Sequence, residues 1–227
     1  SQYHSYLLSG VGYTMLIALI GTAAGFLIGL LTGVIRTAPV SKNAVIRALH
    51  KLVNAIIAVY IEVFRGTPMM VQAMVIYWGY AFLNDGATLP LIPAGLFIVS
   101  INTGAYMAEI VRGGIISVDK GQLEGAYSVG MTHSQAMVKV VIPQVLQNIL
   151  PSISNEFVIN IKDTSVLNVI GVTELYYMAG VIKRINLQTF QVYTVICVLY
   201  FILTFTVTRL LRLAEKTGGA AHVPQVL

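Results

Sequence analysis

Near its amino end the chain reads VGYTMLIALIGTAAGFLIGLLTGVI at residues 11–35, a stretch without one charged side chain. A helix needs roughly 20 predominantly apolar residues to cross a bilayer, so this stretch predicts a membrane-spanning helix. Three further runs have the same character, at about residues 91–111, 140–163 and 189–212. The sequence therefore predicts an all-α, polytopic membrane protein.

The composition of the whole chain agrees with this prediction. Of the 227 residues 56% are hydrophobic and only 10% are charged, whereas a soluble domain has about 25% charged residues. The net charge of +5 does not indicate nucleic acid as a partner, because the basic residues are scattered between apolar runs. The single cysteine excludes a disulfide within the chain, and the four histidines lack metal-ligand spacing. We expect no cleavable signal, because residues 1–9 lack a basic start.

The stretch at residues 52–83 is less regular. It is apolar except for Glu62, Gln72 and the sequence RGTP at residues 65–68. It predicts either one long helix kinked at this sequence or two short helices. Proline removes a backbone hydrogen bond, but neighbouring groups in a membrane can satisfy the freed carbonyl.

The distribution of basic residues favours five spans over six. With five spans and an external amino terminus, ten of the fourteen basic residues lie in the cytoplasm, as the positive-inside tendency expects. These ten are Arg36, Lys42, Arg47, Lys51, Arg112, Lys120, Lys139, Arg209, Arg212 and Lys216. A sixth span would place residues 112–139 outside. We therefore predict one permeation domain at residues 1–217, with its carboxyl end in the cytoplasm, and a flexible tail at residues 218–227.

The connection between the third and fourth spans, at about residues 113–139, contains the sequence GQLEGAYSVGM at residues 121–131. It predicts a short helix with Glu124 near its start, where the helix dipole favours an acidic side chain. Gly130 is predicted to end or turn that helix. A compact helix–turn–helix of small residues suits docking into a groove of another protein, although an ordinary amphipathic connector fits the residues equally well.

This connection resembles the cytoplasmic coupling loop of ABC importer permeases. The signature of that loop is Glu-Ala-Ala, a glycine four residues after the last alanine, and a later Leu-Pro. The corresponding residues in this chain are Glu124, Gly125, Ala126 and Gly130, with Ile142 before the proline. The sequences RGTPMMVQ (65–72), GAYMAEIVRGGI (104–115) and KDTS (162–165) resemble, in the same order, segments of the polar amino-acid subfamily.

The resemblance implies the type I permease architecture of an ABC importer, in the inner membrane of a bacterium. It also implies three kinds of protein partner: ATP-binding cassette ATPase subunits at the coupling loop, a second permease copy or sister permease, and an extracellular substrate-binding protein. The chain has no Gly-x-x-x-x-Gly-Lys-Ser/Thr phosphate loop. We therefore expect a transport subunit rather than an enzyme, with no cofactor of its own, and ATP and Mg bound by the ATPase subunits.

The fourth span carries polar residues that predict a substrate site. Ser152, Glu156, Asn160 and Asp163 are spaced by four, four and three, so they share one helix face. A carboxylate at membrane depth costs roughly 3 kcal/mol and normally faces a cavity. The predicted substrate-binding residues of this span are Glu156, Asp163, Asn155, Asn160 and Lys162.

Glu156 suggests a substrate with a cationic side chain, such as arginine, lysine or histidine. Two alternatives stay open at this point. Glu156 could instead pair with a basic residue such as Lys162 or Arg65, or with a side chain of a partner chain. The ammonium group of any amino acid also favours a carboxylate, so glutamine, glutamate or cystine would fit the same family.

Residues of other spans complete the predicted site. Asn102 and Tyr106 lie four apart on one face of the third span and could hydrogen-bond the α-carboxylate or α-amino group, although polar residues also join helices in membranes. Met70, beyond the RGTP sequence, predicts an adaptable apolar wall. The ion pairs predicted at helix ends are Glu62–Arg65 and Glu109–Arg112.

Two other classes of protein are alternatives to an ATP-driven importer. A secondary amino-acid transporter or channel also uses intramembrane carboxylates, but it needs no coupling loop. A membrane enzyme is disfavoured, because neither a Ser-His-Asp set nor a metal cluster can be assembled from these residues.

Overall fold

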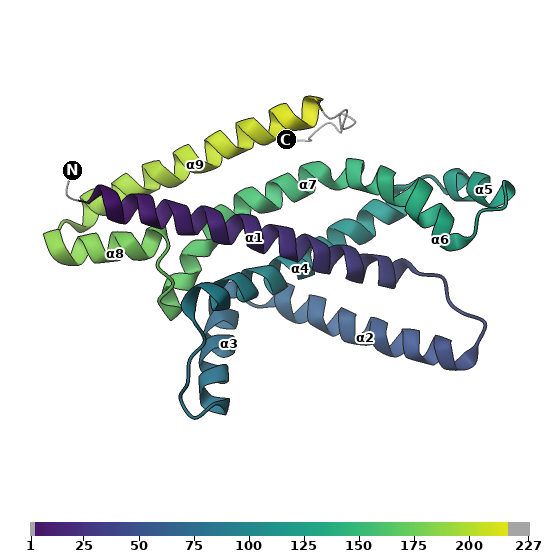
Figure 1. Ribbon diagram of the computed structural model, residues 1–227, viewed down its shortest axis with the longest axis horizontal. Coiled ribbons are helices and arrows are strands. Elements are labelled where there is room, and N and C mark those ends of the chain that lie inside the picture. Colours follow the sequence, from purple (N-terminus) through teal and green to yellow (C-terminus); the bar gives the residue numbers. More distant parts are fainter. Residues whose placement is uncertain (1–2, 218–227) are drawn as a thin grey trace.

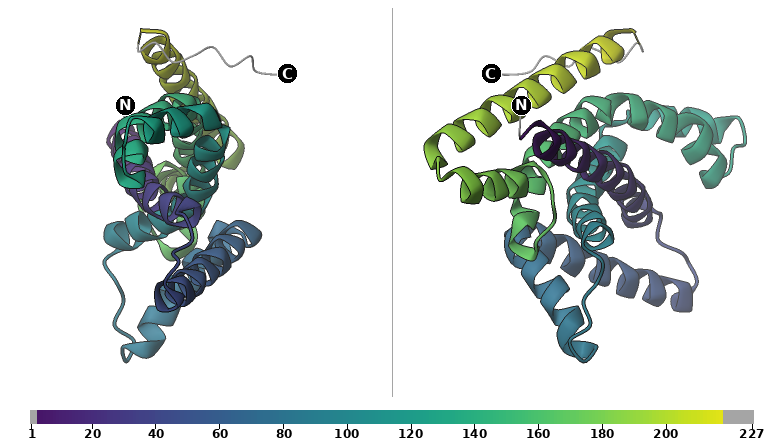
Figure 2. Two further views of the ribbon diagram at one scale, coloured as in Figure 1. Left: turned by 90° about the vertical axis from the view of Figure 1, so that its right-hand side faces the viewer. Right: turned by 60° about the vertical axis from the view of Figure 1, so that its left-hand side comes forward.

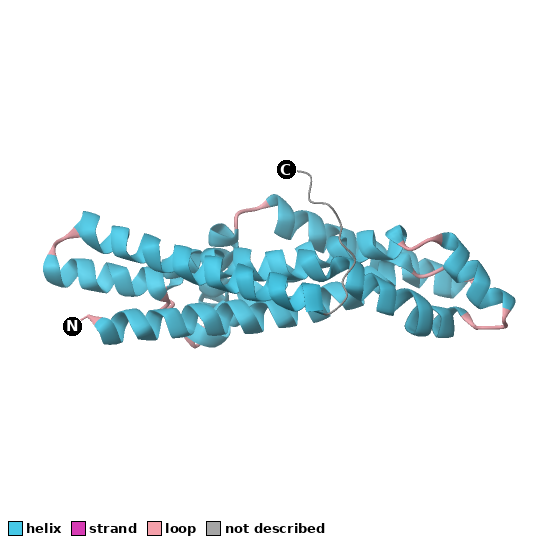
Figure 3. Ribbon diagram, turned by 90° about the horizontal axis from the view of Figure 1, so that it is seen from above, coloured by secondary structure: helices cyan, strands magenta, loops and turns pink. Residues whose placement is uncertain are grey.

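The computed structural model describes residues 3–217, and the part of the chain that it describes is built of helices (Figures 1 and 3). The elements are α1 (His4–Thr37), α2 (Ala44–Gly66), α3 (Met69–Leu83), α4 (Leu91–Ser117), α5 (Lys120–Ser128), α6 (His133–Ala136), the π-helical turn η1 (Met137–Val141), α7 (Ile142–Asp163), the 3-10 turn η2 (Thr164–Ile170), α8 (Leu175–Asn186) and α9 (Thr189–Thr217). The predicted tail at residues 218–227 lies outside the described residues.

Five helical stretches in the described residues are long and apolar enough to cross a membrane, which confirms the predicted number of spans. These are His4–Thr37, Ala44–Gly66, Leu91–Ser117, His133–Ile170 and Thr189–Lys216. Most run past the predicted apolar segments into polar residues. For example, α2 begins at Ala44 rather than near residue 52, because the Asn43 side chain caps it by accepting hydrogen bonds from the N–H groups of Val45 (2.9 Å) and Ile46 (3.4 Å).

Helices α1 and α4 lie directly against each other along most of their length. Every fourth residue of α1 from Gly21 to Gly33 is a glycine that faces α4. A Cβ atom added at Gly21 would lie 2.5 Å from Val99 of α4, and one at Gly25 would lie 2.7 Å from Thr103. Small residues at this spacing let two membrane helices approach until their backbones touch. The α1–α4 contact therefore forms the centre of the fold.

The RGTP sequence separates α2 from α3, so the stretch at residues 52–83 is two helices rather than one kinked helix. Thr67 is extended (φ −124°, ψ 148°), as expected for a residue before proline. Figures 1 and 2 show α3 turned away from the direction of α2. The Gln72 amide donates hydrogen bonds to the backbone carbonyls of Phe64 and Thr67, both at 2.9 Å. These bonds satisfy carbonyls that the break leaves without a helical partner.

The predicted coupling loop forms two short helices at one end of the molecule (Figure 1). Asp119 caps α5 with a hydrogen bond of 2.6 Å from the N–H of Gly121. Gly130 follows α5 with a φ of +82°, a conformation that glycine adopts without steric cost. Thr132 and Gln135 then form a capping box at the start of α6. The helix–turn–helix and the turning role predicted for Gly130 are confirmed. The position predicted for Glu124 near the helix start is wrong: α5 already begins at Lys120 behind the Asp119 cap, so Glu124 lies in the middle of the helix and not in its first turn.

At the opposite end, α8 and the start of α9 form a helical hairpin (Figures 1 and 2). Its anchor is Glu174, which is completely buried and caps α8. The carboxylate accepts hydrogen bonds from the N–H groups of Tyr176 (2.9 Å) and Tyr177 (2.7 Å) and from the hydroxyl of Tyr200 (2.8 Å). Burial raises the pKa of this carboxyl, and the hydrogen bonds act in the opposite direction.

Candidate functional site

The polar face of α7 is buried at its centre and exposed at its ends. Glu156 is 9% exposed and Asn160 is 3% exposed, whereas Ser152 and Asp163 are exposed. The predicted spacing therefore does bring these residues onto one side of α7. Their surroundings differ, and so do the roles that their side chains can have.

Asn160 joins three helices. Its amide donates hydrogen bonds to the hydroxyl of Thr22 on α1 (2.7 Å) and to that of Thr103 on α4 (3.0 Å). The Thr103 hydroxyl is also within hydrogen-bonding distance, 3.2 Å, of the side-chain oxygen Oδ1 of Asn160. In this structure the Asn160 side chain holds α7 against the α1–α4 contact and does not face open space.

Glu156 lies one helical turn from Asn160 and makes no hydrogen bond or ion pair with any residue in the range 3–217. Both ion pairs in that range involve Glu109 instead. Pairing of Glu156 with Lys162 or Arg65 is therefore wrong for this structure. A buried carboxylate without a partner costs more than a paired one, which makes Glu156 the residue of α7 best suited to take a ligand.

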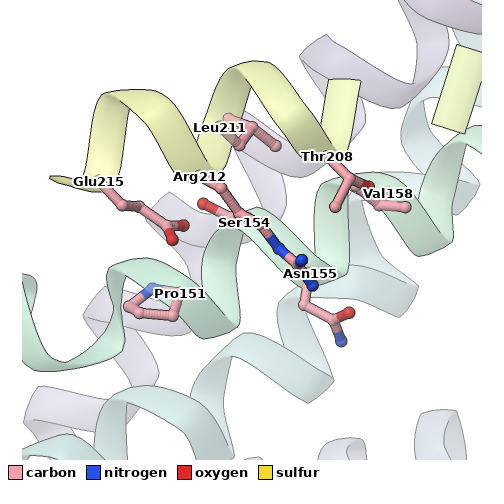
Figure 4. A pocket seen from close by; sticks show the side chains of 8 residues that line it. All are labelled: Pro151, Ser154, Asn155, Val158, Thr208, Leu211, Arg212 and Glu215. Atoms are coloured by element: carbon pink, nitrogen blue, oxygen red, sulfur yellow. The ribbon is translucent and has the colours of Figure 1, made fainter. Parts of the chain in front are cut away.

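Asn155 and Lys162, the two flanking residues predicted on α7, line two different cavities. Asn155 lines a cavity of about 80 Å³, here called the α7–α9 cavity, between residues 151–158 of α7 and 208–215 of α9 (Figure 4). Lys162 lines a different cavity of about 290 Å³, whose wall includes the rings of Tyr176, Tyr193 and Tyr200. The structure thus does not gather all predicted residues of this span into one site.

The predicted residues Asn102, Tyr106 and Met70 lie at the break between α2 and α3. The Asn102 amide donates a hydrogen bond of 2.9 Å to the Gln72 side chain, which itself bonds the free carbonyls of the break. Tyr106 is half exposed and lies under the guanidinium of Arg65, 5.5 Å from the ring centre. Met70 is 46% exposed. Gln72 was predicted only as a polar interruption of an apolar stretch and as part of the RGTPMMVQ resemblance, and its role in holding the break was not predicted.

The ion pairs predicted at helix ends have different outcomes. Glu109 and Arg112 form the expected pair at 2.8 Å, and Arg36 of α1 joins it on the other carboxylate oxygen. The predicted Glu62–Arg65 pair is wrong. The Arg65 guanidinium stacks on Tyr106, while Glu62 is exposed on α2.

The residues predicted to couple to an ATPase form an accessible surface. Glu124, Gly125 and Gly130 are exposed, and Ala126 is buried. No atom lies within 4 Å of a Cβ built at Gly125 or Gly130. The large apolar side chain of Val129 in the same turn is 72% exposed. An exposed apolar residue beside small ones suits a protein contact.

Comparisons with known proteins connect this arrangement to transport. Residues 25–216 match the family described as the binding-protein-dependent transport system inner membrane component. The chain is 34% identical over 210 residues to the glutamine transport system permease protein GlnP of Escherichia coli strain K12, covering 92% of this chain and 91% of that protein. It is 33% identical over 211 residues to the L-cystine transport system permease protein TcyB of Bacillus subtilis, covering 92% and 85%.

Solved structures agree with the sequence relatives. A crystal structure of an amino acid ABC transporter with histidines is 36% identical and superposes with a TM-score of 0.81, covering 95% of each chain. An inward-facing structure of the MetNI methionine ABC transporter has a TM-score of 0.68 at 20% identity, covering 91% of this chain and 94% of that one. The second likeness concerns the fold alone.

Proposed function

The chain belongs to the family of binding-protein-dependent transport system inner membrane components, and we propose that it forms the translocation path of an ATP-driven amino-acid importer. The proposed substrate is a polar amino acid with a basic side chain. Transport follows an alternating-access scheme in which partner ATPases bind the coupling helices. The relatives named for glutamine and cystine, and the structure of an amino acid ABC transporter with histidines, support an amino acid as the substrate class.

The observation that carries the proposal is the nearly buried carboxylate of Glu156 on α7, which has no hydrogen-bond or ion-pair partner among the described residues. A cationic substrate group would supply the missing charge partner in a low-dielectric setting, where the attraction is strong. Asp163 lies two turns further along the same face and is exposed, so it can attract the same cation on its way to Glu156. Lys162 beside it carries the opposite charge and suits the α-carboxylate.

The break between α2 and α3 supplies the second part of the proposed path. Irregular backbone is tolerated at membrane depth where it lines a cavity or is buried in protein. Asn102 and Tyr106 border this break from α4, and Met70, the second residue of α3, is 46% exposed. These side chains offer amide, hydroxyl and thioether groups to the polar and apolar parts of an amino acid.

The coupling residues Glu124, Gly125, Ala126 and Gly130 are proposed to seat on ATP-binding cassette subunits, which bind ATP and Mg. An extracellular binding protein and a second permease, identical or sister, complete the proposed importer. In this scheme the chain lies in the bacterial inner membrane with its amino terminus outside. Arg36, Lys42 and the basic residues near the carboxyl end then lie in the cytoplasm, together with α5 and α6.

Glutamine, glutamate or cystine is the second candidate, and a specific observation favours it. The curated relatives at 33–34% identity are named for glutamine and cystine. An α-ammonium group would also satisfy Glu156, so the carboxylate alone does not distinguish the two candidates.

The test measures ATP hydrolysis by the reconstituted importer with arginine, lysine, histidine, glutamine and cystine added in turn. We expect a basic amino acid to raise hydrolysis, and Glu156→Gln to reduce that rise at least tenfold, since about 1.4 kcal/mol of lost binding is a factor of ten. Glu62→Gln is the matched control, because Glu62 is exposed on α2 and has no ion-pair partner among the described residues. Stimulation by glutamine alone would assign the second candidate, and an unchanged response of Glu156→Gln would remove Glu156 from the site.

A further inference from the structure

The α7–α9 cavity carries charged groups that the proposed translocation path does not use. Arg212 and Glu215 of α9 line it, and Figure 4 shows both side chains extending from α9 toward α7. Ser154 and Asn155 line the facing side. None of these four side chains makes a hydrogen bond or ion pair with another residue between positions 3 and 217.

The two charges are near each other and yet do not pair. Arg212 and Glu215 are three apart on one helix, a spacing that permits contact. The chain uses the same spacing for the Glu109–Arg112 pair, which closes to 2.8 Å. On α9 the guanidinium and the carboxylate remain more than the 4.0 Å of an ion pair apart. A cation and an anion therefore border the same small space separately.

We propose that the α7–α9 cavity binds a small zwitterion, with its anionic group on Arg212 and its ammonium group on Glu215. A lone anion in this cavity would be repelled by Glu215, and a lone cation would be repelled by Arg212. A molecule with both charges satisfies both residues at once. The Ser154 hydroxyl, which has no other partner in the described residues, can donate a hydrogen bond to the anionic group.

The dimensions of the cavity match such a group. By the same measure of volume one water molecule needs about 10–15 Å³, so a cavity of about 80 Å³ has room for about five non-hydrogen atoms, as in the α-carbon with its ammonium and carboxylate. Two kinds of molecule could supply such a zwitterion: a free amino acid, or a lipid with an aminoethyl phosphate headgroup. The neighbouring Leu210 and Leu213 are each 61% exposed, so lipid can reach the cavity from that side.

The experiment uses the full chain, including residues 218–227, in nanodiscs of phosphatidylglycerol, and follows thermal unfolding. Glycine is the probe, because it is a zwitterion without a side chain. We expect glycine to raise the melting midpoint by about 2–4 °C near saturation. Equal concentrations of acetate and methylammonium, which carry the two charges on separate molecules, should have no effect.

Three variants locate the response. Arg212→Gln and Glu215→Gln should each abolish it. Arg209→Gln should retain it, because Arg209 stacks on Phe205 at 5.0 Å and is not among the residues that line the cavity. Since no transport is measured, the result does not depend on the proposed substrate or on the partner subunits.

A second set of measurements, with phosphatidylethanolamine added to the nanodisc, distinguishes a lipid headgroup from a free amino acid. If phosphatidylethanolamine in the nanodisc raises the midpoint of the native chain but not of the two variants, and glycine does not, the zwitterion is a lipid headgroup. If glycine alone acts, it is a free amino acid. The proposal is overturned if neither compound shifts the midpoint, or if both shifts persist in Arg212→Gln and Glu215→Gln.

Discussion

Where α1 meets α4, glycines bring the two helices into close contact, whereas α7 and α9 border a cavity of about 80 Å³ that is lined in part by polar side chains. Both contacts join helices that are apolar enough to span a membrane. In lipid, helices associate through close contact and hydrogen bonds rather than through the hydrophobic effect. The α1–α4 contact therefore contributes to stability. The α7–α9 contact instead leaves a cavity bordered by polar side chains that have no partner among the described residues.

The largest expected effect lies in the α1–α4 contact. In Gly29→Ala the new Cβ would lie 2.6 Å from a backbone carbon of Met107 and 2.8 Å from the N–H nitrogen of Ala108. Backbone atoms in the middle of a helix cannot move aside locally, so we expect a loss of about 2–3 kcal/mol. The melting midpoint of the purified chain measures it.

Gly12→Ala on the same helix is the matched control. A Cβ at Gly12 meets nothing within 4 Å, and alanine favours the helix by up to about 1 kcal/mol over glycine. The midpoint should therefore stay level or rise. Equal losses in the two variants would contradict a contact role for the glycines.

An intermediate effect is expected where α7 joins the α1–α4 contact. Asn160→Leu removes the hydrogen bonds to Thr22 and Thr103, and we expect it to cost about 1–2 kcal/mol in a membrane setting. Combining it with Thr103→Val should add little, because both changes remove the same bonds. Additive losses in a double-mutant cycle would mean that the two side chains act independently.

The smallest effect is expected at the α7–α9 contact. Ser154 lines the cavity and has no hydrogen-bond partner in the described residues, so Ser154→Ala should change stability by no more than about 0.5 kcal/mol. The same melting experiment checks it in the absence of glycine and phosphatidylethanolamine. A loss as large as that of Asn160→Leu would remove the difference between the two contacts.

Much of the fold could be predicted from apolar run lengths and charge. Runs such as residues 11–35 are long enough to define spans, and the RGTP sequence carries its own break signal in Pro68. The start of α2 was missed because the cap at Asn43 is a local hydrogen bond, and basic residues in the next turns resemble a loop. Helix ends depend on such bonds more than on hydropathy.

The candidate site could be predicted only in part, because helical periodicity fixes a face but not its neighbour. Glu156 and Asn160 were correctly assigned to one side of α7. On that side Asn160 bonds threonines of α1 and α4, whereas Glu156 has no partner in the part of the chain that the structure describes. These neighbours come from residues 22 and 103, far away along the chain. The same limit concealed the bond between Gln72 and Asn102, which joins α3 to α4.

The glycine contact between α1 and α4 also limits how this protein can change shape. At Gly21, Gly25, Gly29 and Gly33 α1 contributes no side chain to the contact, and side chains of α4 pack directly on its backbone. Sliding one helix along the other would therefore drive these α4 side chains into the next residues of α1. They must travel as a single rigid body. We therefore expect a hinge only in segments that lack such a contact, namely the break between α2 and α3 at Thr67 and the contact of α7 with α9 around the α7–α9 cavity.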